Sequence, residues 1–238
     1  MRNRLHCKSL LAHLLAVCIC LSLSAPALAT KDNDGFWAIF STTDALPSSD
    51  DNGRWLYWFD AQARYFDLGT GVNIYLVRPG LGYKLNDNVS AWAGYARLRS
   101  RNQSGAVIDE DRYWQQLSWT AGRWNDGTLS MRTRLEQRSV SSGDDTRVVL
   151  RFLAKYVRPI GTDGKRYLSI GVEPFLDLND TDWGGKSGPG QNRTSIGVGW
   201  RVSEKLSIEA SYMNQLIWVD GGEDRVNHLG TLNFKVKL

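Results

Sequence analysis

The chain has 238 residues, with 29 Lys or Arg against 25 Asp or Glu, so its formal net charge at pH 7 is +4. Three of those basic residues and all three cysteines lie within the first 20 positions; without them the charge is +1 and no cysteine remains. This composition excludes a disulfide framework or a cysteine metal site beyond that segment, and it offers no charge argument for nucleic-acid binding.

The first 29 residues have the three parts of a secretory signal peptide. Basic residues at positions 2, 4 and 8 precede an apolar stretch from Leu10 to Leu23, and Ala27-Leu28-Ala29 supplies a small-x-small cleavage site. The apolar stretch is shorter than the roughly 20 residues of a membrane-spanning helix, which disfavours a retained anchor. We expect cleavage after Ala29, export from the cytoplasm, and a mature domain of residues 30–238.

Residues 35–42, with the sequence GFWAIFST, form the first candidate strand of the mature domain. The rest of the chain, from residue 54 onward, gives ten strands, and this segment would make an eleventh. Two interpretations stay open: a segment in the lumen or periplasm, or one strand of a twelve-strand barrel whose partner strand is not recognised.

From residue 54 onward, the chain repeats stretches of about 10 to 14 residues in which apolar and polar side chains alternate, the signature of a transmembrane β-barrel. In residues 147–157, the apolar face is clear and the opposite face carries Arg147, Arg151 and Lys155. These strands are longer than the five or six residues usual in soluble sheets, so a soluble sandwich or a lipocalin-like fold is the less favoured alternative. Short connections alternate with longer polar ones, which predicts a closed antiparallel all-β barrel of about ten strands with both ends in the periplasm.

Several strands carry motifs with a distinctive order and spacing: RPGLGYKL from Arg78, GYARLRS from Gly94, EDRYWQQL from Glu110, RTRLEQR from Arg132 and GVEPFLDLND from Gly171. Together they resemble the bacterial family of unknown function DUF2490, from Trp37 to the C-terminus. The resemblance implies an outer-membrane barrel of this size with no established reaction or ligand. The chain departs from barrel proteins in general by ending in Leu238, where assembly signals usually end in an aromatic residue.

Placing the apolar face of each strand against lipid turns the charged side chains inward, because a lipid-facing Arg or Lys near the midplane costs about 2–4 kcal/mol. The resulting lumen is mostly basic. Its predicted charged residues are Arg64, Arg78, Arg112, Arg132, Arg134, Glu136, Arg138, Arg147, Arg151, Lys155, Glu173, Arg193, Arg201 and Glu209.

Two functions are compatible with such a lumen. Uncompensated positive charge favours a small channel that prefers anions. Alternatively, Arg–carboxylate pairs close a narrow lumen and hold it rigid, and the protein is then a structural or surface-recognition barrel, similar to an adhesin. The sequence predicts an uncharacterised integral outer-membrane protein, with the channel as the leading hypothesis.

A lipid-modifying enzyme is a minor alternative, because His228 is the only histidine of the mature domain and lies on the lipid-facing side of the final strand. Catalysis needs a nucleophile within hydrogen-bond reach of that base, whereas Ser207 and Ser211 on the neighbouring strand are predicted to point into the lumen. We therefore expect no enzyme activity.

The polar connection at residues 179–192 contains Asn179, Asp180 and Asp182, which offer oxygen atoms for calcium. A loop rich in Gly and Asp is more often simply a flexible external loop, so no metal and no cofactor are expected. The expected partners are outer-membrane lipid and lipopolysaccharide and the barrel assembly machinery, with no nucleic acid.

Overall fold

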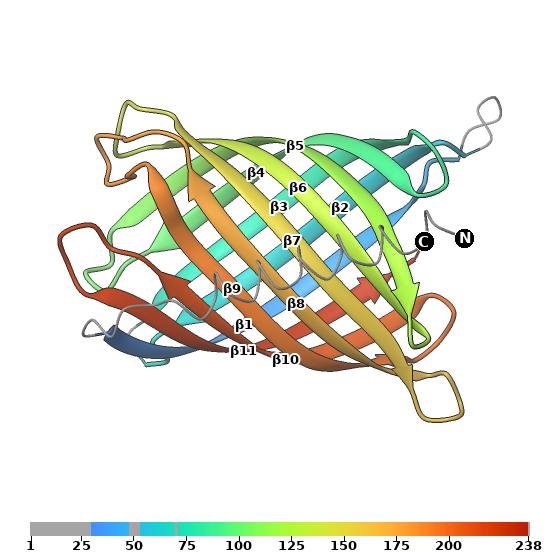
Figure 1. The fold of residues 1–238 in the computed structure, drawn as a ribbon. Helices are drawn as coiled ribbons and strands as arrows, with labels where there is room; N and C mark the ends of the chain where they lie inside the picture. Colours follow the sequence, from blue (N-terminus) through green and yellow to red (C-terminus); the bar gives the residue numbers. More distant parts are fainter. Residues whose placement is uncertain (1–29, 48–52, 70, 238) are drawn as a thin grey trace, which may run out of the picture.

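The protein is described by a computed structural model of residues 30–47, 53–69 and 71–237, and the predicted signal peptide lies outside the described residues. The chain forms a closed barrel of strands that are inclined to its long axis (Figure 1). The predicted all-β closed barrel is confirmed. In the part of the chain described, no helix is long and apolar enough to cross a membrane.

Within the described residues, eleven strands make up the barrel wall, and every sequential pair is antiparallel. Their bounds are β1 Thr30–Ala45, β2 Trp55–Phe66, β3 Val72–Lys84, β4 Val89–Arg101, β5 Val107–Trp124, β6 Gly127–Val140, β7 Arg147–Ile160, β8 Arg166–Asp177, β9 Gly188–Arg201, β10 Leu206–Ile217 and β11 Asp224–Val236.

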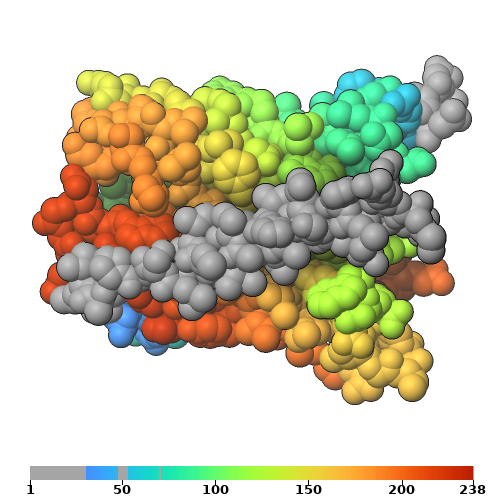
Figure 2. Space-filling model, in the orientation of Figure 1, coloured from blue at the N-terminus to red at the C-terminus, as the bar shows by residue number. Residues whose placement is uncertain are grey.

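The two ends of the barrel differ in their connections. One end carries the β2–β3, β4–β5, β6–β7, β8–β9 and β10–β11 connections, including residues 178–187; we call it the loop end. The opposite end, the turn end, carries tight links such as the β5–β6 turn, where Asn125 and Asp126 both adopt positive φ (47° and 61°) as a two-residue hairpin requires. In the space-filling view, the β7–β8 connection projects beyond the wall at the turn end (Figure 2).

The segment that did not fit the strand count, residues 35–42, lies within β1 and closes the barrel. The ten strands predicted from residue 54 onward are β2 to β11, so the prediction of about ten is short by one. Because an odd number of alternating strands brings two strands of the same direction together, β1 and β11 pair in parallel, from Thr30↔Asp224 to Thr42↔Val236. Consequently β1 begins at the loop end, whereas β2 begins and β11 ends at the turn end, so the ten strands predicted from residue 54 onward start and finish at the same end of the barrel.

The β1–β11 seam depends on a glycine that lets three strands approach closely. A Cβ atom on Gly35 would lie 2.4 Å from the backbone oxygen of Tyr65 on β2 and 2.7 Å from Leu229 Cδ2 on β11. Real Cβ atoms do not approach other atoms so closely, and a backbone oxygen held in a sheet cannot move aside without breaking its ladder.

We expect Gly35→Val to loosen the seam, with a loss of about 1–3 kcal/mol of unfolding free energy from overpacking. Urea unfolding of the refolded protein in lipid vesicles, followed by tryptophan fluorescence, measures this change. Gly230→Val is the matched control, because a Cβ there would lie no closer than 3.3 Å to the Phe36 ring and 3.9 Å to the Gly35 backbone oxygen. An equal loss in both variants would contradict the assigned role of Gly35.

Alternation along the strands gives the barrel two different faces. The outward side chains are mainly large and apolar, and many are well exposed, such as Tyr75 at 47%, Leu81 at 55% and Ile196 at 51%. Inside, the β2–β5 side holds two apolar clusters, one around Trp92 and Trp114 and one of Leu76, Ala96 and Leu98. Buried charged groups lie both on this side, such as Asp60 and Arg78, and on the remaining wall.

Candidate functional site

Two buried carboxylates on β6 and β8, joined by one arginine, form the centre of the lumen. Arg151 on β7 donates from Nη1 to Glu136 Oε1 at 2.5 Å and from Nη2 to Glu173 Oε1 at 2.7 Å. The three side chains are at most 9% exposed. Because a buried charge is tolerable only when it is paired, each group depends on the others.

Glu136 is also contacted by cations from two strands, β5 and β6. Arg138 donates to its Oε2 from Nε at 2.9 Å and from Nη2 at 2.5 Å. Arg112 on β5 and Arg134 on β6 place a terminal nitrogen 3.8 Å and 3.7 Å from its carboxylate oxygens. Four guanidinium groups therefore surround one carboxylate whose side chain is 1% exposed.

Glu173 is the equivalent centre for two other arginines. Arg132 hydrogen-bonds its Oε1, and Arg193 Nη1 lies 4.0 Å from its Oε2. The Arg193 guanidinium also stacks over the rings of Trp37 and Phe175, at 5.0 Å and 4.7 Å from their centroids. Aromatic faces attract a cation, so they replace part of the charge compensation that a second carboxylate would give.

Further ion pairs extend this network toward both ends. Arg78 holds Asp60 through two hydrogen bonds, at 2.6 Å and 3.0 Å. The other pairs join Arg112 to Glu110, Arg147 to Asp177, and both Lys155 and Lys235 to Glu209.

Aromatic side chains fill the lumen where charges do not. Trp114 is 1% exposed and fits because β3 and β4 carry glycines beside it: a Cβ on Gly80 or Gly94 would lie within 2.5 Å of its ring. Trp37 is 2% exposed and lies under Arg64, whose Cζ is 4.3 Å from the ring centroid. Together the indole rings and the ion pairs fill the middle of the lumen.

The predicted lumen residues are brought together with one exception. Thirteen of the fourteen make the buried or half-buried contacts described above. Arg201 is exposed at the turn-end mouth of the lumen, where its Cζ lies 5.1 Å from the ring centroid of the buried Tyr167 and its Nη1 donates to the Gly164 carbonyl at 2.5 Å. Glu110 was not predicted as a lumen carboxylate, and neither was the contact of Trp37 and Trp114 with arginine side chains of the lumen. The signal for Glu110 was its place two residues before Arg112 on the same face of one strand.

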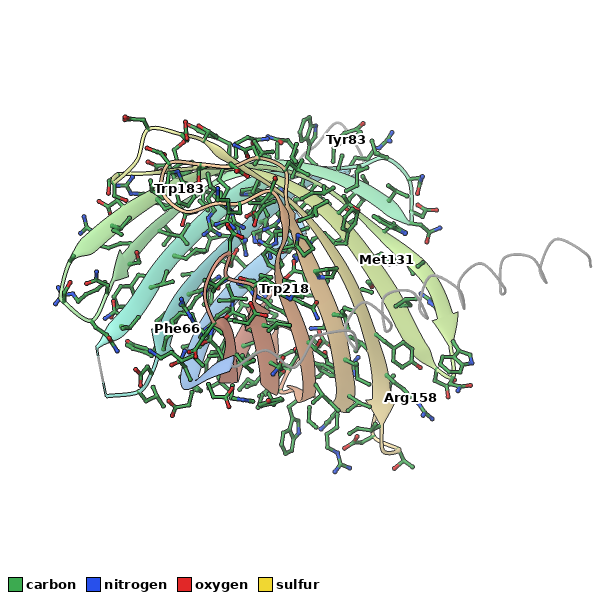
Figure 3. The ribbon with its side chains drawn as sticks, turned by 60° about the vertical axis from the view of Figure 1, so that its left-hand side comes forward. Phe66, Tyr83, Met131, Arg158, Trp183 and Trp218 are labelled. Atoms are coloured by element: carbon green, nitrogen blue, oxygen red, sulfur yellow. The ribbon has the colours of Figure 1, made fainter. Side chains whose placement is uncertain are left out.

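At the loop end, the β6–β7 and β8–β9 connections brace each other. The Asp182 carboxylate accepts hydrogen bonds from the backbone nitrogens of Asp144 and Asp145, at 2.9 Å and 3.1 Å. In return, Asp182 N donates to Asp145 Oδ2 at 2.8 Å, and Trp183 Nε1 donates to the Asp145 carbonyl at 2.8 Å. Figure 3 shows Trp183 at this end of the barrel, with Trp218 on the β10–β11 connection. The two connections form one braced surface, which we call the loop platform (residues 141–146 and 178–187).

The oxygens that the sequence offers to calcium are held within this platform. Asn179 Oδ1 accepts from Val148 N at 2.7 Å, and Asp180 Oδ1 accepts from Ser187 N at 2.7 Å. Among the described residues, no group of three or more His, Cys, Asp or Glu is arranged to hold a metal ion.

Backbone donors lower the pKa of Asp182 below its ordinary value, first Asp144 N and then Asp145 N. A carboxyl group whose pKa is lowered in the folded protein stabilises the fold at pH values above its unfolded pKa, about 3.9. This stabilisation is lost as the pH falls through the folded pKa.

We expect the platform to be closed at neutral pH, to loosen as the pH drops below about 4, and to be loosened at pH 7 by Asp182→Asn. Hydrogen exchange of residues 141–146 and 178–187 measures this opening. Asp220→Asn in the β10–β11 connection is the control, and equal exchange in the two variants would contradict the bracing role.

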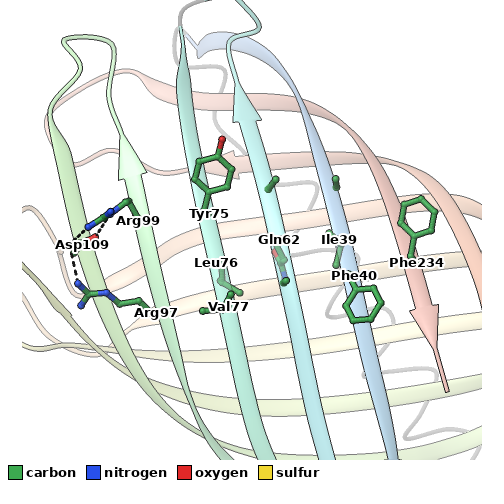
Figure 4. Close-up of a pocket in the computed structure, with 13 residues that line it drawn as sticks. Ile39, Phe40, Gln62, Tyr75, Leu76, Val77, Arg97, Arg99, Asp109 and Phe234 are labelled. Carbon is green, nitrogen blue, oxygen red and sulfur yellow. Dashed lines mark hydrogen bonds and ion pairs between the residues drawn. The ribbon is translucent and has the colours of Figure 1, made fainter. Parts of the chain in front are cut away.

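The outer face has a groove where β1, β2 and β3 carry small side chains, with a volume of about 610 Å³. Ala38, Ala61 and Ala63 are among its lining residues, together with Phe40 on β1 and Tyr75 on β3 (Figure 4). Two outward arginines near the loop end border it. They are compensated by outward carboxylates on the next strand: Arg97 pairs with Asp109 and Asp111, and Arg99 pairs with Asp109.

Comparison with known proteins decides the family. The profile described as "Protein of unknown function (DUF2490)" matches residues 34–227. The chain belongs to the DUF2490 family. The resemblance found in the strand motifs is thereby confirmed.

An uncharacterised protein of Methylorubrum extorquens is 31% identical to this DUF2490 chain over 185 residues, which cover 76% of the chain and 80% of the relative. Among solved structures, the NanC porin is 12% identical with a TM-score of 0.47, over 80% of this chain and 92% of that one. OmpT of Vibrio cholerae is 11% identical with a TM-score of 0.38, over 73% of this chain and 62% of that one.

The lone histidine of the DUF2490 barrel lies on the outer face, where its partner is a phenol. His228 Nδ1 and the Tyr212 hydroxyl are 2.6 Å apart, and His228 Nε2 lies 4.0 Å from Asp32 Oδ1 across the β1–β11 seam. Ser207 and Ser211 occupy the alternate, inward positions of β10. The contact ties three strands together at an exposed position and does not place a serine beside the imidazole.

Proposed function

We propose that this DUF2490 protein is an outer-membrane barrel whose lumen is closed to solutes and whose loop platform recognises a partner at the cell surface. The proposed role is non-enzymatic. The observation that carries it is the packed middle of the lumen, where Glu136, Arg134 and Trp114 are each at most 1% exposed.

The outer face supports placement in a membrane. A continuous apolar surface of this kind is costly in water and suits lipid. Aromatic residues lie near the strand ends, as in the interfacial girdles of outer-membrane barrels: Trp55, Trp124 and Trp200 near the turn end, and Tyr65 and Tyr75 near the loop end. External loops of such barrels are longer than periplasmic turns, which supports an outward loop end and, as partners, the surrounding lipid and lipopolysaccharide.

The braced platform supports recognition rather than a mobile lid. A partner that binds a flexible loop must order it at an entropic cost, whereas the platform is already held by four hydrogen bonds between Asp144, Asp145, Asp182 and Trp183. Arg147, at the loop-end mouth of the lumen, stacks its guanidinium 5.7 Å from the Trp183 ring centroid and links the platform to the wall.

An anion-selective channel is the second candidate, favoured by the excess of arginine over carboxylate around Glu136 and Glu173. Recording from the purified protein in a planar bilayer separates the two functions. The closed barrel gives no stepped conductance in potassium chloride, and regular steps with a reversal potential that follows chloride would replace this proposal by the channel.

The orientation is tested with single cysteines, because residues 30–238 contain none. Lys186→Cys on the platform is expected to react with a membrane-impermeant maleimide in intact cells. The matched variant Lys205→Cys, exposed at the turn end, is expected to react only after the outer membrane is opened. The reverse pattern would place the platform in the periplasm and overturn surface recognition.

A further inference from the structure

The turn end of the lumen contains a second cavity that the closed-barrel role does not use. It has a volume of about 410 Å³, extends from the β3–β4 turn to Trp58 and Gln116, and is walled by β2 to β7; we call it the vestibule. Because the packed middle of the barrel lies beyond it, the vestibule is a blind pocket rather than part of a passage.

The lining of the vestibule is basic and rich in hydrogen-bond donors. Lys84, Arg132 and Lys155 contribute cations, and Asp87 at the rim is the acid among the lining residues. The Lys84 amine makes no ion pair or side-chain hydrogen bond with the described part of the chain. Ser118 and other hydroxyls lie between the cations, so the pocket presents both charge and neutral donors.

The guanidinium group of Arg134 lies next to the inner end of the vestibule, and two of its nitrogen atoms make no hydrogen bond to a described residue. Arg134 is fully buried; its Nε donates to the lining residue Gln116 at 2.7 Å, and its Cζ lies 5.4 Å from the ring centroid of the lining residue Trp58. Nη1 lies at ion-pair distance from Glu136 Oε1, 3.7 Å, but neither Nη1 nor Nη2 hydrogen-bonds to any described residue, and Arg132 Nε is also buried without an acceptor. Buried donors normally have acceptors, so this concentration of unsatisfied donors beside a cavity points to an acceptor from outside the chain.

We propose that the vestibule is a binding site for a small oxyanion, a phosphate or a carboxylate group, that enters from the turn end. The two Nη atoms of Arg134 form a planar fork, in which Nη2 offers a donor to an oxygen of such a group while Nη1 also lies 3.7 Å from Glu136 Oε1. Lys84 supplies positive charge from the wall, and Arg132 adds the buried Nε donor that its ion pair with Glu173 leaves without an acceptor. Gln116 swings aside to admit the anion to the fork, because its amide is held by Ser118 Oγ and Arg134 alone. The site stands independently of surface recognition, since it lies at the opposite end of the barrel.

Isothermal titration of the refolded protein with inorganic phosphate, at constant ionic strength in chloride, tests the site. We expect saturable binding that Lys84→Gln weakens about fivefold and Arg134→Lys about tenfold, because each removes a charge-assisted donor. Lys205→Gln is the control: it removes an equal charge from the same end but outside the vestibule, and is expected to change affinity less than twofold. Acetate in place of phosphate distinguishes a carboxylate site from a phosphate site.

Absence of saturable binding of either anion would overturn the proposal, as would equal affinity in the wild type and the Lys84 variant. An equal loss in the Lys205 variant would show general attraction by positive charge and would also overturn it. Arg134 belongs to the folded network, so its variant is first checked for the altered electrophoretic mobility of a folded barrel. Where that variant does not fold, Lys84→Gln and Ser118→Ala, both on the vestibule wall, decide the question.

Discussion

Replacing Glu136 by glutamine is expected to destabilise the barrel more than any other single exchange of a charged group. The substitution keeps the side-chain shape but leaves Arg138 and Arg151 without the carboxylate that each contacts at 2.5 Å, and removes the compensation of two further arginines. Removing one partner of a buried ion pair costs about 3–5 kcal/mol, because the remaining charges stay buried. Urea unfolding in lipid vesicles measures this loss.

Two comparisons isolate the buried network as the cause. Glu204→Gln removes an identical charge from the exposed β9–β10 turn and is expected to change the unfolding free energy by less than about 0.5 kcal/mol. The double variant Glu136→Gln with Arg138→Gln is expected to recover part of the loss, since one uncompensated cation leaves with the carboxylate. A small effect of Glu136→Gln, similar to that of Glu204→Gln, would mean that water reaches the network and that the lumen is open.

The architecture was largely readable from the sequence because a barrel strand has a local signal. Alternation with period two fixes which side chains share a face, and it correctly predicted every strand from β2 to β11. The role of residues 35–42 was not readable, because β1 pairs with β11 across almost the whole length of the chain and in parallel. The alternation within one strand does not indicate whether a strand far away in the sequence pairs with it in parallel or antiparallel.

The candidate site was predicted in its composition but not in its connections. Facing rules identify Arg134 and Glu136 as inward residues, whereas the pairing of Arg151 with carboxylates on both β6 and β8 depends on the register of three strands. The loop platform was missed for a different reason: Asp182 is held by backbone nitrogens, which have no signature in the amino-acid sequence. A loop rich in Gly and Asp therefore appeared flexible when it is braced.

Removing the two buried tryptophans from the lumen is expected to convert the closed barrel into an anion-selective pore. Trp37 and Trp114 fill different parts of the lumen, and each lies against arginines that make no hydrogen bond to a carboxylate of the described residues: Arg64 and Arg193 beside Trp37, and Arg134 beside Trp114. In Trp37→Ala/Trp114→Ala, water enters the space left by both indoles and the guanidinium groups line it. The positive lining concentrates anions. Planar-bilayer recordings should show stepped currents with a reversal potential near that of chloride, against no steps in the wild type.

The double variant also loses buried apolar surface, about 3–5 kcal/mol for each tryptophan, so folded protein is first selected by its electrophoretic mobility. Trp55→Ala/Trp200→Ala is the matched control, because these tryptophans are 45% and 56% exposed on the outer face. It removes the same two indoles without opening the lumen and is expected to stay silent. Currents in the control would locate the leak in the membrane around the barrel. A silent Trp37→Ala/Trp114→Ala variant that is folded would show that the Arg–Glu network alone closes the lumen, which then needs Arg151 replaced as well before ions pass.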